Sequence, residues 1–217
     1  MTPAIVQPKA VIFDFGGVLL DLDLPAMTLA FEALGVTSVE ALFSLHRYSP
    51  AFIDLEIGAI DPATFATALR RQTGLSFDDE SLFQAWNALL GGYRLRSLSF
   101  VEQLGAAMPV YLYSNTNLIH YRRFQQEIRE ATPYPHLDVL FRKAYYSHEM
   151  GMRKPHPEGY QHILQENGLK PQTTLFVDDN ADNIAGAAAV GLQTHHLQST
   201  EIIEDALAWL LAGQDVI

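Results

Sequence analysis

Short apolar runs that end in a polar residue alternate along this chain with longer segments whose apolar residues recur at helical spacing. The first run starts at Lys9, is rich in β-branched residues and ends in Asp14 before two glycines, which predicts a buried parallel strand and a tight loop. Further strands are predicted at residues 110–113, 143–147, 173–177 and 192–195. Helices are predicted at residues 97–107, 119–130, 157–167, 183–190 and 201–211. Strands separated by helices indicate an α/β fold with a doubly wound parallel sheet covered on both faces.

A long block between the first two strands departs from this alternation. From Leu24 to Leu95 the apolar spacing is helical, turn signals such as Gly58 interrupt it, and no convincing strand is present. Roughly seventy residues of helix are too many for an ordinary crossover between parallel strands. The pattern therefore predicts a helical subdomain, residues 23–95, inserted into a core made of residues 1–22 and 96–217.

Charge and composition narrow the possible partners. The formal net charge of -11 argues against nucleic acid and against an anionic membrane surface, since both attract clustered Lys and Arg. A phosphorylated substrate stays compatible, because it needs only one local positive site. The chain has no cysteine, which excludes disulfides, a thiolate nucleophile and a thiolate metal site. No apolar run approaches the ~20 residues that span a bilayer and no secretion signal is visible, so a cytoplasmic protein is expected. Nothing in the pattern points to a particular oligomeric state.

Polar candidates for chemistry lie near the ends of the predicted strands. Asp14 ends the first strand, Ser114 the second and the pair Asp178-Asp179 the fourth, while Lys154 lies just before a helix. Taken singly, each is explained as well by a helix cap or a solvated charge. Ligands of open α/β sheets, however, bind outside the carboxyl ends of the strands, where these side chains would converge. Adjacent carboxylates repel unless a cation lies between them, and oxygen ligands suit Mg²⁺.

The motifs around these residues resemble those of the haloacid dehalogenase superfamily of hydrolases. In chain order they are Phe13-Asp14-Phe15-Gly16-Gly17-Val18, Leu112-Tyr113-Ser114-Asn115, Lys154-Pro155 and Phe176-Val177-Asp178-Asp179. The resemblance covers the whole chain and implies a Rossmann-like sheet with the helical insertion as its cap. Within the superfamily, Gly16-Gly17-Val18, Ser114-Asn115-Thr116-Asn117, Glu149-Met150-Gly151 and residues 178–183 are similar to sugar-phosphate phosphatases that include bacterial α-glucose-1-phosphate phosphatase.

The resemblance also implies an activity, the hydrolysis of the phosphomonoester of a small metabolite. Asp14 would attack phosphorus and form an aspartyl phosphate that water then hydrolyses. Mg²⁺ would be held by Asp14, the backbone carbonyl of Gly16 and the pair Asp178 and Asp179, with Asp179 the more direct ligand. The transferring phosphoryl oxygens would be held by Ser114, the backbone N–H of Asn115 and Lys154.

One position departs from the family pattern. Most phosphatases of the superfamily carry a second aspartate two residues after the nucleophile, which protonates the leaving group, and here that residue is Gly16. Asp21 and Asp23 follow closely and are candidates for its role, as is a water molecule. A solvated hinge between core and cap is the favoured interpretation of both aspartates.

Two other functions stay open. A metal-free dehalogenase of the same superfamily would also use an aspartate nucleophile, but it has no use for the pair Asp178-Asp179. A catalytically weak binding protein is suggested by Gly16, whereas the presence of Asp14 and Lys154 argues against it. Substrate choice is expected to depend on the cap, where polar or aromatic candidates are His46, Arg47, Tyr48, Trp86, Asn87, Tyr93 and the loop Glu56-Ile57-Gly58. For any single one of them, packing or solvation is the simpler interpretation.

Overall fold

The computed structural model of the chain describes residues 7–37, 39 and 50–212. A five-stranded parallel sheet with the order β5-β4-β1-β6-β7 forms its centre. The strands are β1 (Ala10–Phe13), β4 (Val110–Ser114), β5 (Lys143–Tyr146), β6 (Thr174–Asp178) and β7 (Gln193–His196). The predicted α/β fold with a parallel sheet is confirmed, and β1 is its fully buried central strand.

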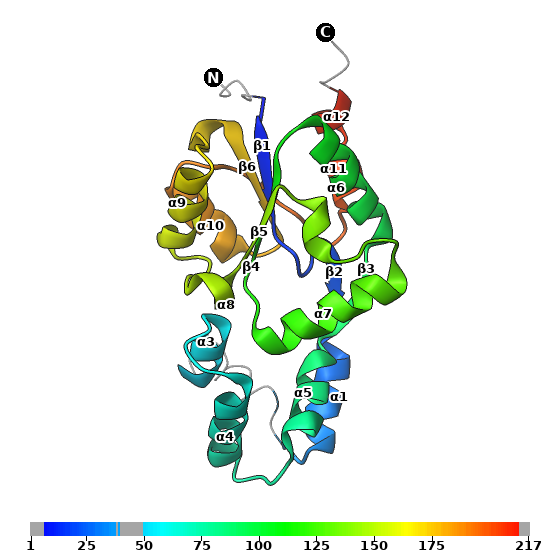
Figure 1. Cartoon of the computed structure of the whole chain (residues 1–217), viewed down its shortest axis with the longest axis vertical. Helices are drawn as coiled ribbons and strands as arrows, with labels where there is room; N and C mark the ends of the chain where they lie inside the picture. The colour runs from blue at the N-terminus through cyan, green and yellow to red at the C-terminus, as the bar shows by residue number, and fades with distance from the viewer. Residues whose placement is uncertain (1–6, 38, 40–49, 213–217) are drawn as a thin grey trace.

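Helices cover both faces of this sheet (Figure 1). Because side chains alternate along a strand, Ala10 and Ile12 of β1 pack on one face and Val11 and Phe13 on the other. The first face is covered by α9 (Pro157–Glu166) and α10 (Ala181–Ala189). The second is covered by α6 (Leu95–Ala107), α7 (Leu118–Ala131), α11 (Ile203–Ala206) and α12 (Trp209–Ala212). Shorter elements are α8 (Ser147–Met150) and the 3-10 helices η1 (Leu137–Leu140) and η2 (Pro171–Thr173).

The helices of the insertion pack around a hydrophobic core of their own, beyond one end of the sheet in Figure 1. They are α1 (Leu24–Ala33), α3 (Pro50–Glu56), α4 (Pro62–Thr73) and α5 (Asp79–Asn87). The side chains of Asp61 and Asp78 cap α4 and α5 by accepting from the backbone N–H groups of Thr64 and Ser81. We call these four helices the cap. The domain limits at 22/23 and 95/96 stay a prediction.

A strand that the sequence did not reveal joins the cap to the core. β3 (Leu90–Tyr93) pairs antiparallel with β2 (Leu20–Leu22), so the prediction that residues 24–95 contain no strand is wrong. Two of the four residues of β3 are glycines, which are depleted in strands and are typical of turns. Gly91 is needed here, because a Cβ at this position would lie 2.8 Å from the backbone oxygen of Asp21.

The predicted helix at residues 201–211 is also wrong, because the structure has two short helices, α11 and α12, in its place. Between them, the N–H of Leu210 donates to the carbonyl of Leu207, three residues back. This tighter winding keeps Leu207 and Leu210 on the same side, where both are fully buried. The apolar spacing therefore predicted the buried face correctly, although not the continuity of the helix.

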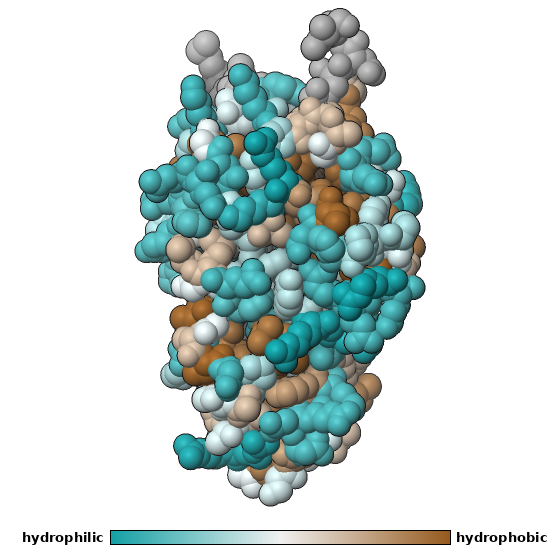
Figure 2. Space-filling model, viewed as in Figure 1, coloured by the Kyte–Doolittle hydropathy of each residue, from teal (hydrophilic) through white to brown (hydrophobic). Residues whose placement is uncertain are grey.

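Hydrophilic residues cover most of the face seen in Figure 2, and hydrophobic residues gather there in smaller groups. Among the described residues, no helix is long and apolar enough to span a bilayer.

Candidate active site

The predicted site residues converge at the carboxyl edge of the sheet. Asp14 directly follows β1, Ser114 ends β4, Asp178 ends β6, and Lys154 lies in the loop before α9. A cavity of about 590 Å³ opens at this edge, between the core and the cap. Its lining includes Asp14, Gly16, Ser114, Asn115, Lys154 and Asp179, and on the cap side Glu56, Leu89 and Leu90.

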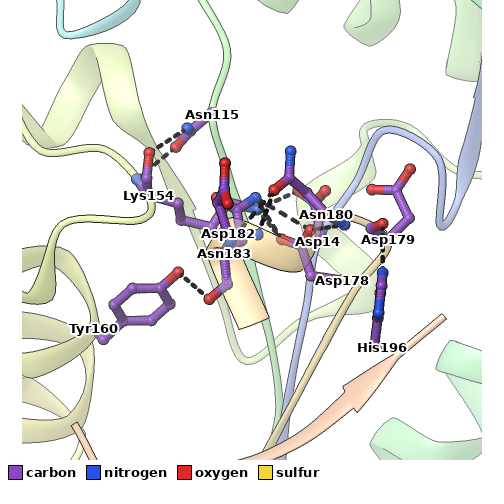
Figure 3. Close-up of polar contacts among 10 residues, drawn as sticks. All are labelled: Asp14, Asn115, Lys154, Tyr160, Asp178, Asp179, Asn180, Asp182, Asn183 and His196. Atoms are coloured by element: carbon purple, nitrogen blue, oxygen red, sulfur yellow. Dashed lines mark hydrogen bonds and ion pairs between the residues drawn. The ribbon is translucent and has the colours of Figure 1, made fainter. Parts of the chain in front are cut away.

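Lys154 is the positive centre of the site (Figure 3). Its side chain is 1% exposed, and Nζ donates to Asp14 Oδ1 at 2.6 Å and to Asp178 Oδ2 at 2.7 Å. The ammonium also lies 5.5 Å from the ring centroids of Tyr113 and Phe176. A buried ammonium is tolerated only when charges or hydrogen bonds compensate it, and here two carboxylates do so. The nearby negative charges therefore raise the pKa of Lys154, against the lowering effect of burial.

Asn115 fixes the position of that lysine. Its side-chain Nδ2 donates to the backbone oxygen of Lys154, and its Oδ1 accepts from the backbone N–H of Lys154, both at 2.9 Å. These two hydrogen bonds, to the N–H and the C=O of the same residue, hold the loop before α9 against the end of β4. The Asn115 side chain thus orients Lys154, which leaves the Asn115 backbone N–H for the phosphate role expected of it.

Asp14, Asp178 and Asp179 form the one cluster among the described residues whose carboxylate oxygens approach closely enough for a shared metal ion, within 4.8 Å of one another. Asp178 is fully buried and accepts from Lys154, from Asn183 Nδ2 at 3.0 Å and from the Asn180 N–H at 2.8 Å. Asp179 is exposed to the cavity. This set of hard oxygen donors fits Mg²⁺.

The loop after β1 is shaped to receive the Asp179 carboxylate. Gly17 has φ +75°, which favours glycine, and a Cβ there would lie 2.1 Å from Asp179 Oδ2. The second glycine of the first motif therefore makes room for a carboxylate of the fourth motif. Gly16 is not among the glycines with positive φ, and it lines the cavity.

The crowding of carboxylates changes their protonation. Burial, reinforced by the charge of Asp178, raises the pKa of Asp14 to about 7, although Lys154 opposes the shift. Burial and Asp178 likewise raise the pKa of Asp179. Both shifts indicate that a further positive charge in this cluster would stabilise the ionised carboxylates.

Asp21 and Asp23, the candidates for the missing acid, are engaged elsewhere. Asp21 Oδ1 accepts from Arg94 Nε at 2.7 Å, and Asp23 Oδ1 accepts from the Ala26 N–H at 2.8 Å and caps α1. Both side chains are exposed and lie in the segment between β1 and α1, and the interpretation of this segment as a hinge stays a prediction.

The cap candidates divide in a similar way. Trp86 is 3% exposed and packs in the cap core, and the Tyr93 hydroxyl donates to the backbone of Phe124. Glu56 lines the cavity, as do Leu89 and Leu90, whereas Asn87 is not among the described residues that line it. His46, Arg47 and Tyr48 lie outside the described residues.

A model of the haloacid dehalogenase-like hydrolases matches residues 8–191 of this chain. The chain belongs to this family. The predicted superfamily and the prediction of an enzyme are thereby confirmed.

Two of the relatives that match most of this chain are named as phosphatases. A D-ribitol-5-phosphate phosphatase of Bacteroides thetaiotaomicron is 30% identical over 86% of this chain and 90% of its own length. A sesquiterpene phosphatase of Aspergillus oryzae is 30% identical over 87% of this chain and 89% of its own. A solved HAD-family enzyme of Bacteroides thetaiotaomicron, a mutant in complex with magnesium and inorganic phosphate, is 30% identical and superposes with a TM-score of 0.84, covering 93% of this chain and 99% of that one.

Sequence reasoning did not assign the contacts of several residues at the site, although Glu56 was named as part of the candidate loop Glu56-Ile57-Gly58. Asn183 holds Asp178, and the pair formed by Glu56 and Arg153 lines the cavity. Asn183 falls within the motif at residues 178–183, but the sequence does not indicate that its side-chain amide binds Asp178. The partners of the ion pair lie 97 positions apart in sequence, and no local pattern connects them.

Replacing Asp179 by Asn is expected to weaken Mg²⁺ binding by at least about tenfold, because one anionic ligand is lost. The metal-free variant should melt at a higher temperature than the wild type at neutral pH. The raised pKa of Asp179 means that its ionised form costs stability in the folded state, and Asn removes that cost. The gain should vanish below about pH 4, where the carboxyl is protonated in both states.

Calorimetric titration and thermal melts with and without Mg²⁺ measure both effects. Asp182→Asn is the matched control, because this aspartate lines the cavity but lies outside the cluster. Unchanged Mg²⁺ affinity in Asp179→Asn would refute the assignment.

Proposed function

We propose that this chain is a Mg²⁺-dependent phosphomonoester hydrolase that acts on a small phosphorylated metabolite through an aspartyl phosphate. The observation that carries the proposal is the buried Lys154 bridging Asp14 and Asp178, beside an exposed Asp179 in the same cavity. This arrangement combines a nucleophile, a fixed positive charge and a place for a metal ion. The family and the named phosphatases among the relatives support it.

In this proposal Asp14 attacks phosphorus in line, so that an Oδ–P bond forms while the bond to the leaving oxygen breaks. Water then displaces the carboxylate and releases inorganic phosphate. Mg²⁺, when held by Asp14, the Gly16 carbonyl, Asp178 and Asp179, reduces the repulsion between an anionic nucleophile and an anionic ester. Lys154, Ser114 and the Asn115 N–H hold the transferring oxygens in place.

The sequence motifs favour a sugar phosphate as substrate. The similarity to a D-ribitol-5-phosphate phosphatase extends this expectation to open-chain polyol phosphates. The resemblance to α-glucose-1-phosphate phosphatases stays a prediction within the same substrate class. A panel of sugar, polyol, aryl and prenyl phosphates, assayed with Mg²⁺ and with a chelator, tests the proposal. Halide release from haloacids without metal would favour a dehalogenase instead, and binding without turnover of any ester would favour a binding protein.

The glycine at position 16 predicts a steep dependence of rate on the leaving group. General acid catalysis contributes about 10²–10⁴-fold and matters most for basic leaving groups. Without an acid, aryl and anomeric sugar phosphates should react much faster than simple alkyl phosphates. In Gly16→Asp the slope should flatten, because the new carboxyl group can protonate the leaving group. The loop has room for this side chain, since a Cβ at Gly16 meets only the flexible Leu22 side chain, at 3.3 Å.

A series of esters with graded leaving-group pKa, assayed on the wild type, Asp21→Asn and Asp23→Asn, measures this slope. We expect the same steep slope in all three, because Asp21 is bound by Arg94 and Asp23 caps α1. A shallow wild-type slope that steepens in one variant would identify that aspartate as the acid.

A further inference from the structure

Glu56 and Arg153 form an ion pair that crosses from the cap to the core at the wall of the active-site cavity. Arg153 Nε donates to Glu56 Oε1 at 3.0 Å, and Nη2 lies 3.5 Å from Oε2. The side chain of Arg153 is 27% exposed and that of Glu56 14%, so the pair is largely buried. Glu56 ends α3 of the cap, whereas Arg153 directly precedes Lys154.

The pair lies where a leaving group has to go. In-line attack by Asp14 expels the leaving oxygen on the side of phosphorus opposite the nucleophile, which is toward the cap. Among the described residues of the insertion that line the cavity, Glu56 of α3 is the polar one, and the others are Leu89 and Leu90, which follow α5. Leu20 and Leu22 continue this apolar wall from the β2 side. The cavity therefore offers the leaving group one charged edge and one apolar face.

The pair also has hydrogen-bonding capacity left over. Among the contacts of the described residues, Arg153 Nη1 has no hydrogen-bond partner, and Arg153 is the only group that bonds to the Glu56 carboxylate. A carboxylate has about four acceptor positions and a guanidinium five donor N–H groups. Burial raises the pKa of Glu56 despite Arg153, which is consistent with a carboxylate short of donors. A ligand hydroxyl can donate to Glu56 and accept from Arg153 at once.

We propose that Glu56 and Arg153 form a hydroxyl-binding subsite that selects phosphate esters of polyols or sugars over esters of plain alcohols. This inference rests on the proposed phosphatase function and names the substrate class of the same cavity. A leaving-group hydroxyl donates to the Glu56 carboxylate, a neighbouring oxygen accepts from Arg153 Nη1, and the C–H groups lie against Leu89 and Leu90. Because Arg153 adjoins Lys154, binding of the hydroxyls aligns the phosphate with its own binding site.

The test compares a pentitol 5-phosphate with n-pentyl phosphate, which has the same chain length without hydroxyls. A site built to hydrogen-bond a hydroxyl rejects the analogue that lacks it by up to about 10⁴–10⁵-fold. For a partly solvated pair we expect the wild-type kcat/KM to favour the pentitol ester by about 10²-fold. Glu56→Gln and Arg153→Met should each lower kcat/KM for the pentitol ester by about tenfold or more, mainly by raising KM. The preference of kcat/KM for the pentitol ester over n-pentyl phosphate should therefore fall by about tenfold or more in each variant.

Arg70→Met is the matched control, because Arg70 forms a 2.6 Å ion pair with Asp79 within the cap and does not line the cavity. Arg70→Met should leave kcat/KM unchanged for both esters. Hydrolysis of n-pentyl phosphate also reports that each variant is folded, and a thermal melt checks this independently. A loss of kcat for both esters in Glu56→Gln would overturn the inference. It would indicate that Glu56 acts as a general acid, or that its ion pair with Arg153 holds the cap against the core. Equal wild-type rates on the two esters would overturn it as well, and a wild type that hydrolyses no ester would refute the proposed function itself.

Discussion

Replacing Asp14 by Asn is expected to lower turnover by about four orders of magnitude or more, as loss of the nucleophile does in hydrolases that act through a covalent intermediate. The amide has nearly the same shape, but it is a far weaker nucleophile and lacks the charge that binds a cation. Asp178 still pairs with Lys154 in this variant, so the positive centre of the site stays compensated. The fold should therefore be preserved.

Steady-state assays of the purified variant, with a thermal melt to confirm folding, measure this effect. Asp23→Asn is the matched control, because it makes the same change at a helix cap outside the cavity and should alter neither turnover nor, since Asn caps a helix about as well as Asp, stability by much. Wild-type turnover in Asp14→Asn would exclude the covalent mechanism.

Replacing Lys154 by Met is expected to destabilise the metal-free protein by about 3–5 kcal/mol, because it leaves Asp14 and Asp178 buried without their cation. The cost should shrink at saturating Mg²⁺, since the metal ion supplies positive charge to the same carboxylates. Turnover should fall by about 10²–10³-fold, because a fixed charge on the transferring phosphoryl group is lost.

Denaturant unfolding with and without Mg²⁺ measures the stability effect. Lys143→Met offers a matched control, because Lys143 Nζ also lies 2.6 Å from a carboxylate, that of Glu166, but both side chains are exposed. That change should cost at most about 1 kcal/mol and should not respond to Mg²⁺. An equal loss of unfolding free energy in Lys154→Met and Lys143→Met would contradict the role given to Lys154.

The parts of this molecule that could be predicted from sequence are those in which a local pattern has one structural solution. An apolar run ending in Asp14 predicts a buried strand, and parallel strands bring their carboxyl ends to one edge. The proximity of Asp14, Ser114 and Asp178 can therefore be predicted from the sequence alone. The sequence did not predict contacts that depend on how distant segments pack, such as the two hydrogen bonds from Asn115 to Lys154 or the ion pair between Glu56 and Arg153.

The same limit explains β3. Its residues Leu90–Tyr93 have little strand propensity of their own, and they form a strand because Leu20 and Leu22 present a partner edge. The glycines that obscured the strand in the sequence are part of its packing, since Gly91 approaches the backbone of Asp21 closely. Gly17 shows the converse, a turn that could be predicted but whose purpose, room for the Asp179 carboxylate, emerges only from the structure.

The central claim is that Asp14 becomes phosphorylated during turnover. The most direct measurement is a rapid acid quench of the Mg²⁺-loaded wild type mixed with a phosphate ester, followed by mass spectrometry of the intact chain and of its peptides. We predict a phosphoryl group on the peptide that contains Asp14, removable by hydroxylamine as expected of an acyl phosphate, and none in Asp14→Asn. Turnover in which no phosphorylated protein accumulates at any quench time, with Asp14→Asn still active, would contradict the account.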